Sequence, residues 1–159
     1  MEYKLPSQQG TPSQMIDVKS LRIGNLLYEA MSYGKELMTV DHLDFERGIN
    51  TFFCAGEFHY LCGKPEGIPL TEEWLLKVGF SKQIGFYKVV EGVFGKGNSL
   101  ELGVNDVNKK TYYVYFRNFN VGEQDDFVIL RNDLMYLHEL QNLYQAITGK
   151  EIEFKDIEK

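Results

Sequence analysis

Aromatic rings and a guanidinium alternate along residues 111–119, which read Thr-Tyr-Tyr-Val-Tyr-Phe-Arg-Asn-Phe. Successive side chains of a strand point to opposite faces, so Tyr113, Tyr115 and Arg117 are expected to share one face. Two rings beside a guanidinium can stack on a base or on a partner's side chain. Cross-strand aromatic packing is the alternative for the same rings. The segment lacks the glycines of the RNP1 pattern, which argues against an RNA-recognition motif. The intervening residues form the expected core face: Tyr112, Val114 and Phe116.

Thiol and imidazole side chains gather in a second stretch of the chain, at His42, Cys54, His59 and Cys62. Only His59 and Cys62 have the short spacing of ligands in a structural zinc site. On a strand these two residues would be out of phase, which also argues against a thiol nucleophile activated by His59. A hairpin disulfide between Cys54 and Cys62 is a further alternative. We expect no metal ligand in this stretch.

Other sets of residues that resemble reactive sites have simpler explanations. The loop at 92–99 contains Gly-Lys-Gly, but the phosphate-binding loop requires Gly-Lys-Ser or Gly-Lys-Thr at the start of a helix. The carboxylate pair Glu72–Glu73 suits a helix start, and the pair Asp125–Asp126 suits a turn. Neither pair has a neighbour that would separate two pKa values for acid–base catalysis. We therefore expect no catalytic residue and no cofactor, with an enzyme of unrecognised type as an alternative.

The composition narrows the class of protein. The chain has 159 residues, 43% of them hydrophobic, and a net charge of −6. The acidic balance argues against a sequence-independent nucleic-acid binder, which needs clustered Lys and Arg. No apolar run approaches the roughly 18 residues of a membrane span, and the polar N-terminus lacks the apolar core of a signal peptide. Two cysteines suit a reducing compartment, so the expected location is the cytoplasm.

Two helices and several antiparallel strands are expected to position these residues in an α+β fold. The strands in the first part of the chain are expected to form a small sheet or a partial barrel. The helices, at about 71–79 and 133–148, are expected to cover the strands. Thr71 is the expected N-cap of the first helix, and Gly79 its end. The Gly- and Pro-containing cluster at 63–67 interrupts the strand pattern. Strands are expected at 21–28, 37–43, 57–62, 84–94, 99–104, 110–119 and 127–131, with an added edge strand at 151–154.

The second helix has an apolar stripe at three- and four-residue spacing. Asn132 or Asp133 is its expected N-cap, and Gly149 its expected C-terminal residue of positive φ. The stripe comprises Tyr136, Leu137, Leu140, Leu143, Tyr144 and Ile147. The opposite face is expected to be solvated or to form a polar recognition surface, with His138, Glu139, Gln141, Asn142 and Gln145.

The N-terminal residues 1–19 are expected to form an arm. They contain Pro6, Gly10, Pro12 and several Ser and Gln residues, a composition that makes a poor core. Residues 20–159 then form a single α+β domain.

Two segments carry a resemblance to a known group of proteins: Ile68 to Phe80, and Leu137 to Glu151. Together they resemble small uncharacterised proteins of phages and mobile elements of Bacteroides-type bacteria. Proteins of that group commonly open with a strand similar to the segment Leu21 to Asn25. The resemblance implies a cytoplasmic accessory protein of a bacterial host and no particular reaction.

These features together favour a protein that acts by binding. The leading interpretation is a non-enzymatic, phage-type accessory protein whose target is a protein partner or its own assembly. The first alternative is a small-ligand protein that binds or sequesters a nucleotide, which requires a pocket of Tyr and Arg with few carboxylates. Tyr113, Tyr115 and Arg117 are the candidate binding residues, with no membrane contact expected.

Overall fold

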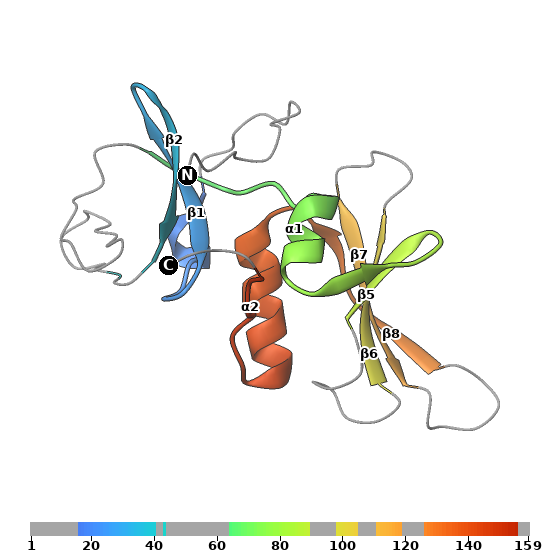
Figure 1. Ribbon diagram of the computed structural model, residues 1–159. Coiled ribbons are helices and arrows are strands. Elements are labelled where there is room, and N and C mark those ends of the chain that lie inside the picture. Colours follow the sequence, from blue (N-terminus) through green and yellow to red (C-terminus); the bar gives the residue numbers. More distant parts are fainter. Residues whose placement is uncertain are drawn as a thin grey trace. The chain divides into compact units, whose positions relative to one another are not determined.

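A computed structural model describes residues 16–40, 43, 64–89, 98–104, 111–118 and 126–155 of the chain. These described residues form a mixed α+β structure with two antiparallel sheets and two α-helices (Figure 1). The predicted fold class is confirmed at this level, and neither sheet closes into a barrel. The chain forms two compact units, Met1–Pro69 and Leu70–Lys159. The single domain and the arm at 1–19 stay predictions, since most of the arm lies outside the described residues.

The first unit contains a three-stranded sheet in the order β2-β1-β3. β1 (Leu26–Met31) and β2 (Gly34–Thr39) form a hairpin, and β3 (Lys64–Glu66) pairs with the other edge of β1. The predicted interruption at 63–67 is therefore wrong in part, because a short strand lies there. Pro65 is tolerated since β3 is an edge strand, where a missing N–H costs little. A small core lies on this sheet: Leu21, Leu27, Met38 and Val40.

The predicted strand at 21–28 begins only at Leu26, because the residues before it form a turn. Gly24 has a φ of +89°, which favours glycine. The side-chain oxygen of Asn25 accepts the backbone N–H of Arg22 at 2.9 Å. Val40 then donates its N–H to the Asn25 carbonyl at 2.8 Å. Local hydrogen bonding by Asn thus replaces the sheet ladder in this segment.

The second unit contains a five-stranded antiparallel meander in the order β4-β5-β6-β7-β8. Its strands are β4 (Phe80–Lys82), β5 (Phe86–Val89), β6 (Asn98–Val104), β7 (Tyr112–Asn118) and β8 (Asp126–Leu134). The predicted strands at 99–104 and 127–131 are confirmed, with β8 longer than expected. The strand predicted at 110–119 is confirmed over 112–118. The expected strand at 57–62 lies outside the described residues.

Helix α1 (Glu72–Lys77) precedes this sheet and begins as predicted. The hydroxyl of Thr71 accepts the N–H of Trp74 at 3.4 Å, and Glu72 and Glu73 occupy the first turn. Val78 is its C-cap, and Gly79, a glycine of positive φ, directly follows the cap as the predicted stop. Its buried residues are Trp74, Leu75 and Val78, which confirms the predicted inner face.

Helix α2 (Leu137–Thr148) begins later than predicted. Asn132 and Asp133 belong to β8, so neither is the N-cap. Tyr136 takes that position, and the Glu139 carboxylate accepts the N–H groups of Met135 and Tyr136, each at 2.9 Å. The predicted end at Gly149 is confirmed by its φ of +69° and its bond to the Gln145 carbonyl.

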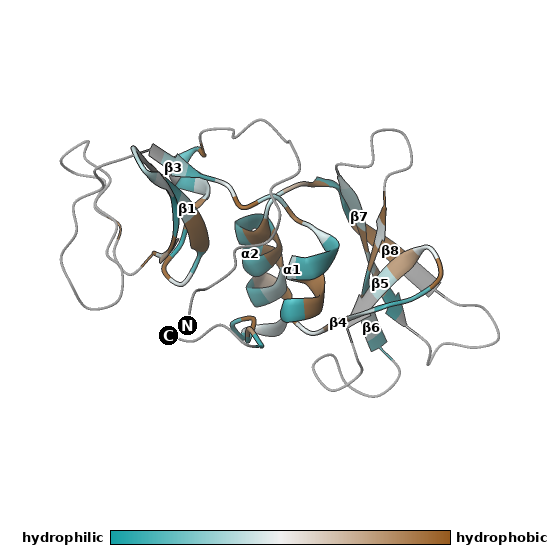
Figure 2. Ribbon diagram, turned by 45° about the horizontal axis from the view of Figure 1, so that its top comes forward, coloured by the Kyte–Doolittle hydropathy of each residue, from teal (hydrophilic) through white to brown (hydrophobic). Residues whose placement is uncertain are grey.

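The prediction of a solvated polar face on α2 is wrong for His138 and Gln141, which are both buried. Gln141 lies four residues after Leu137 and three before Tyr144, so helical geometry places it within the buried stripe. Figure 2 shows hydrophobic and hydrophilic residues on both α1 and α2. Within the described residues, no helix is long and apolar enough to span a membrane.

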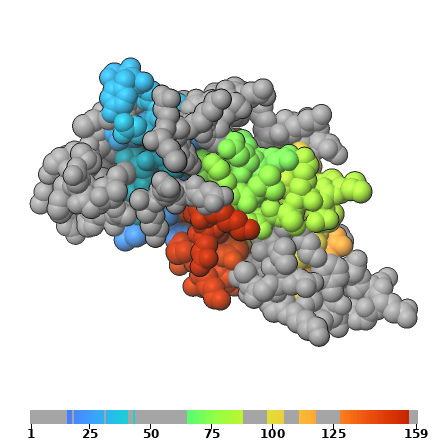
Figure 3. All heavy atoms as spheres, viewed as in Figure 1, coloured from blue at the N-terminus to red at the C-terminus, as the bar shows by residue number. Residues whose placement is uncertain are grey.

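The predicted edge strand at 151–154 is also wrong, because this segment packs on α1 without joining a sheet. The N–H of Lys155 donates to the carbonyl of Lys77 at 2.8 Å. The ring of Phe154 meets Trp74 edge-to-face at 6.3 Å, and the C-terminal segment and α1 lie side by side in Figure 3. The segment 151–155 thus covers the indole of Trp74 and does not extend a sheet.

Candidate functional site

The two faces of the five-stranded sheet have different roles. Tyr87, Leu102 and Val114 are register partners on neighbouring strands and are buried. The Tyr87 hydroxyl donates to Glu72 of α1 at 2.9 Å, so this face carries α1. Arg131, the register partner of Val114, binds Glu139 of α2. Both helices therefore contact the same face, and the opposite face is the one that carries the candidate site.

The predicted residues Tyr113, Tyr115 and Arg117 all lie on this opposite face. Their register partners on β6 are Gly103, Glu101 and Ser99. The Tyr113 and Tyr115 rings stack with centroids 6.4 Å apart and an interplanar angle of 28°. Two of the predicted core residues, Tyr112 and Val114, are buried, whereas Phe116 is only half-buried. Strand alternation therefore predicted correctly which residues of β7 share a face.

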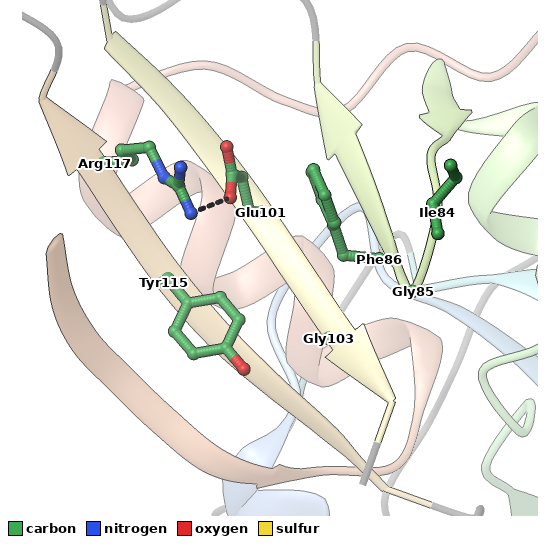
Figure 4. Close-up of a pocket in the computed structure, with 7 residues that line it drawn as sticks. All are labelled: Ile84, Gly85, Phe86, Glu101, Gly103, Tyr115 and Arg117. Carbon is green, nitrogen blue, oxygen red and sulfur yellow. Dashed lines mark ion pairs between the residues drawn. The ribbon is translucent and has the colours of Figure 1, made fainter. Parts of the chain in front are cut away.

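Two of the three predicted residues, Tyr115 and Arg117, line a pocket of 320 Å³ (Figure 4). Tyr113 is not among the lining residues, but its ring stacks on the ring of Tyr115. The rest of the wall comes from β5, β6 and the turn before β5. The full lining is Ile84, Gly85, Phe86, Glu101, Gly103, Tyr115 and Arg117.

The polar part of the pocket is an ion pair between Glu101 and Arg117. Their Oε2 and Nη2 atoms are 3.2 Å apart, and the two side chains point toward one another in Figure 4. The Ser99 hydroxyl donates to the other carboxylate oxygen at 3.1 Å. Glu101 is only 2% exposed. A buried carboxylate needs such partners, since an isolated one would be strongly destabilising.

Gly103 provides the space that the Tyr115 side chain occupies. A Cβ atom at position 103 would lie 2.7 Å from the Tyr115 hydroxyl oxygen and 3.1 Å from its Cε2 atom. Any side chain at this position would displace the ring. Burial raises the pKa of Tyr115, and the neighbouring Tyr113 and Glu101 raise it further. The phenol therefore keeps its proton at neutral pH.

Sequence reasoning did not identify Glu101, Gly103, Ile84 or Phe86 as pocket residues. Glu101 lies between two leucines in the sequence, and its role depends on the register that places it opposite Tyr115. Alternation along this strand places Ser99, Glu101 and Gly103 on one face and Leu100 and Leu102 on the other. This grouping could have been predicted from the sequence. The partner strand could not be assigned from that alternation alone.

The arrangement is suited to binding, and it lacks a pair for acid–base chemistry. Arg117 supplies a guanidinium group with N–H donors and no acceptor. Glu101 is held by the Ser99 hydroxyl and the Arg117 guanidinium. Tyr115 stays a phenol because its pKa is raised. The pocket thus presents a charge-neutral polar end and an apolar wall, on which a flat or apolar group can pack.

The other sequence candidates lie elsewhere. His42, Cys54, His59 and Cys62 are outside the described residues, as are residues 92–97 of the glycine-containing loop. Among the described residues, no group of three or more His, Cys, Asp or Glu side chains could hold a metal ion.

Glu72, from the first carboxylate pair, has a structural role beyond the start of α1. It accepts the Lys82 ammonium at 2.7 and 2.8 Å and the Tyr87 hydroxyl at 2.9 Å, which ties α1 to β4 and β5. Hydrogen bonds from Lys82 and Tyr87 lower the pKa of Glu72. These contacts lie on the helix-bearing face, away from the pocket.

Comparisons of the chain with known protein families, with curated proteins and with solved structures found no match.

The contact between positions 103 and 115 gives a direct test of the pocket geometry. Gly103→Ala should lower the free energy of unfolding by about 1–3 kcal/mol, because the added methyl overpacks against the Tyr115 ring. In a Tyr115→Ala background the same substitution should cost less than about 0.5 kcal/mol. A double-mutant cycle by urea denaturation measures the coupling. Additive costs in the two backgrounds would contradict the close approach of this ring to Gly103.

Proposed function

We propose that this protein acts by binding and not by catalysis, and that its pocket accepts an uncharged aromatic or aliphatic side chain of a protein partner. The observation that carries the proposal is the neutral Glu101–Arg117 pair at the end of an otherwise apolar pocket. Ile84, fully exposed at 100%, and Phe86 form an apolar wall that a partner's side chain would cover. Aromatic residues and arginine are the types that dominate binding hot spots.

The nucleotide alternative is less well supported by this geometry. A nucleotide brings phosphate charge, and it would need a cation whose charge is available to it. The Arg117 guanidinium is instead 3.2 Å from the buried Glu101 carboxylate. A phosphate placed on Arg117 would therefore meet a carboxylate that cannot move into solvent without breaking its bond to Ser99. Electrostatics favour an uncharged ligand.

The wider role that we propose is that of a phage-type accessory protein in the cytoplasm of a bacterial host. The resemblance of residues 68–80 and 137–151 to proteins of phages and mobile elements supports this role. Much of what these two segments share is structural, namely the Thr71 cap, the Gly149 cap and two apolar helix faces. The proposed binding site lies on other strands, so its partner is not inherited from the resemblance.

Small probes that copy single side chains test the pocket directly. N-acetyl-tryptophanamide and N-acetyl-leucinamide should shift the backbone amide NMR signals of Glu101, Gly103 and Tyr115, with a Kd on the order of 1 mM, as expected for one side chain. AMP should shift these signals less at equal concentration. A stronger response to AMP would support the nucleotide alternative, and no response to any probe at about 10 mM would overturn the proposal.

Ile84→Asp supplies a variant for the same titration. Ile84 is fully exposed, so its loss should leave the fold unchanged, while the new carboxylate at the pocket wall should weaken binding of apolar probes at least about tenfold. Ile23→Asp is the matched control, because Ile23 is also an exposed isoleucine, at 59%, and lies in the other unit. If Ile84→Asp and Ile23→Asp bind the apolar probes with equal affinity, the probes bind outside the pocket.

A further inference from the structure

The two charged residues of the pocket differ in how far they reach water. The Arg117 side chain is 31% exposed, whereas that of Glu101 is 3% exposed. Both line the pocket, and the guanidinium and the carboxylate face each other in Figure 4. A ligand that enters the polar end of the pocket therefore meets the surface of the guanidinium, with a buried carboxylate next to it.

The Glu101 carboxylate is held at both of its oxygens. The Ser99 hydroxyl donates to Oε1 at 3.1 Å, and Arg117 Nη2 lies 3.2 Å from Oε2. Ser99 is itself fully buried. The negative charge of Glu101 can therefore turn away from an arriving anion only by breaking these contacts. Because the group is excluded from water, salt also screens it less than an exposed charge.

Arg117 can still serve an uncharged acceptor at its exposed surface. A guanidinium has five N–H donors, and the printed geometry of the ion pair joins one nitrogen, Nη2, to one oxygen of Glu101. The carbonyl oxygen of an amide brings no net charge, so the nearby carboxylate does not repel it. A carboxylate in the same place would be attracted by Arg117 and repelled by Glu101 at similar range. It would also lose its hydration, which an amide needs less.

We propose that Glu101 determines which ligands the pocket accepts: an apolar or aromatic side chain flanked by uncharged amides, and not the same side chain with a carboxylate attached. The first is an internal residue of a partner's chain, and the second is a C-terminal residue or a free amino acid. Without Glu101, an exposed arginine at the end of an apolar pocket is suited to binding carboxylates. This inference rests on the proposed function and specifies its ligand.

Two probes that differ only in this group test the selectivity of the parent protein. N-acetyl-tryptophanamide has an uncharged amide where N-acetyl-tryptophan has a carboxylate. Titrations followed by the backbone amide NMR signals of Gly103 and Tyr115 should give a Kd at least about tenfold lower for the amide. If neither probe binds, the proposed function fails and this inference with it. If both bind equally, the proposed function stands and the role of Glu101 is overturned.

Glu101→Gln removes the charge and keeps the shape of the side chain. The glutamine carbonyl can accept from Arg117 and its NH₂ group can donate to the Ser99 oxygen, so the buried polar groups stay paired. N-acetyl-tryptophan should bind this variant about tenfold more tightly than the parent protein, which brings the two Kd values close together. If the variant weakens both probes by the same factor, Glu101 has only a structural role and the proposal is wrong.

Glu73→Gln is the matched control, because it changes the net charge of the protein by the same amount. Glu73 lies on α1, where its side chain is 49% exposed and pairs with Lys77 at 3.4 Å. This variant should keep the preference of the parent protein for the amide. Equal loss of the preference in both variants would assign it to net charge and overturn the proposal.

The salt dependence of the parent protein gives a measurement that needs no variant. At about 0.3 M NaCl the contributions of distant surface charges are largely screened, whereas that of a buried neighbouring carboxylate is not. The preference for the amide should therefore persist at about fivefold or more. Its disappearance at this salt concentration would show that surface charge, and not Glu101, excludes the carboxylate.

Discussion

Replacement of Leu140 by alanine should lower the free energy of unfolding by about 2–5 kcal/mol, the range for truncation of a well-packed leucine. Leu140 is 0% exposed, and it lies in the stripe of α2 that also buries Leu137 and Tyr144. The substitution removes apolar contacts and leaves a cavity that the surrounding side chains can fill only in part. Alanine preserves helix propensity, so the loss measures packing.

Leu76→Ala is the control for this prediction. Leu76 is also a helical leucine, but it is 44% exposed, and its truncation should cost less than about 1 kcal/mol. Urea denaturation of both variants, analysed with a common m-value, gives the comparison. A loss below about 1 kcal/mol for Leu140→Ala would mean that this face of α2 is not part of the core.

The features of the fold that could be predicted from the sequence are those encoded by neighbouring residues. The hydroxyl of Thr71 binds an N–H three residues later, and Gly149 takes a backbone conformation that other residues avoid. The strand at β7 follows from a pattern of period two. Each of these signals operates within a few residues of the chain, so no knowledge of the tertiary structure is needed.

The start of α2 was mispredicted because two local signals compete at the same residues. Asn132 and Asp133 are good helix caps. They nevertheless belong to β8, where the pairing with β7 extends to Leu134. Tertiary pairing overrides capping preference, and Glu139 instead reaches back from the first turn to accept the N–H groups of Met135 and Tyr136. Which of the two signals prevails cannot be predicted from this segment alone.

The candidate site, too, could be predicted only in part, because some of its residues are brought together by strand pairing. Strand alternation grouped Tyr113, Tyr115 and Arg117 on one face, because that grouping depends only on β7. Glu101 and Gly103 complete the pocket through the register between β6 and β7. Register is a relation between two strands, and alternation along either strand alone does not specify it. The residue that neutralises Arg117 was therefore outside the reach of the sequence pattern.

A marked dependence of stability on pH is expected from His138. Its side chain is on a helix face predicted to be solvated, yet the residue is only 3% exposed. Its Nδ1 atom has no hydrogen-bond partner within the described part of the chain, and its ring stacks on Tyr136 at 5.8 Å. Burial lowers the pKa of His138 from 6.5 to about 4; the Glu139 carboxylate opposes this shift, and Arg131 adds to it.

The direction of this pH effect follows from the difference between the pKa of His138 in the unfolded chain and its pKa in the folded protein. The unfolded chain protonates His138 near pH 6.5, whereas the folded protein does so only near pH 4. Between these values the unfolded state binds more protons, so the free energy of unfolding falls as the pH falls. The contribution of neutral His138 is complete above pH 6.5. Its loss amounts to roughly 2–3 kcal/mol by pH 4.5, at about 1.4 kcal/mol per pKa unit.

His138→Leu separates this contribution from that of the carboxylates, which titrate in both proteins. Leucine has a similar volume and does not titrate, so the variant should lack the part of the stability loss that lies between pH 6.5 and 4.5. Urea denaturation of both proteins at pH 7.5, 6.5, 5.5 and 4.5 gives the difference at each pH. That difference should shift by roughly 2–3 kcal/mol in favour of the variant toward pH 4.5. A difference that stays constant with pH would show that the imidazole accepts a proton in the folded state as readily as in the unfolded chain.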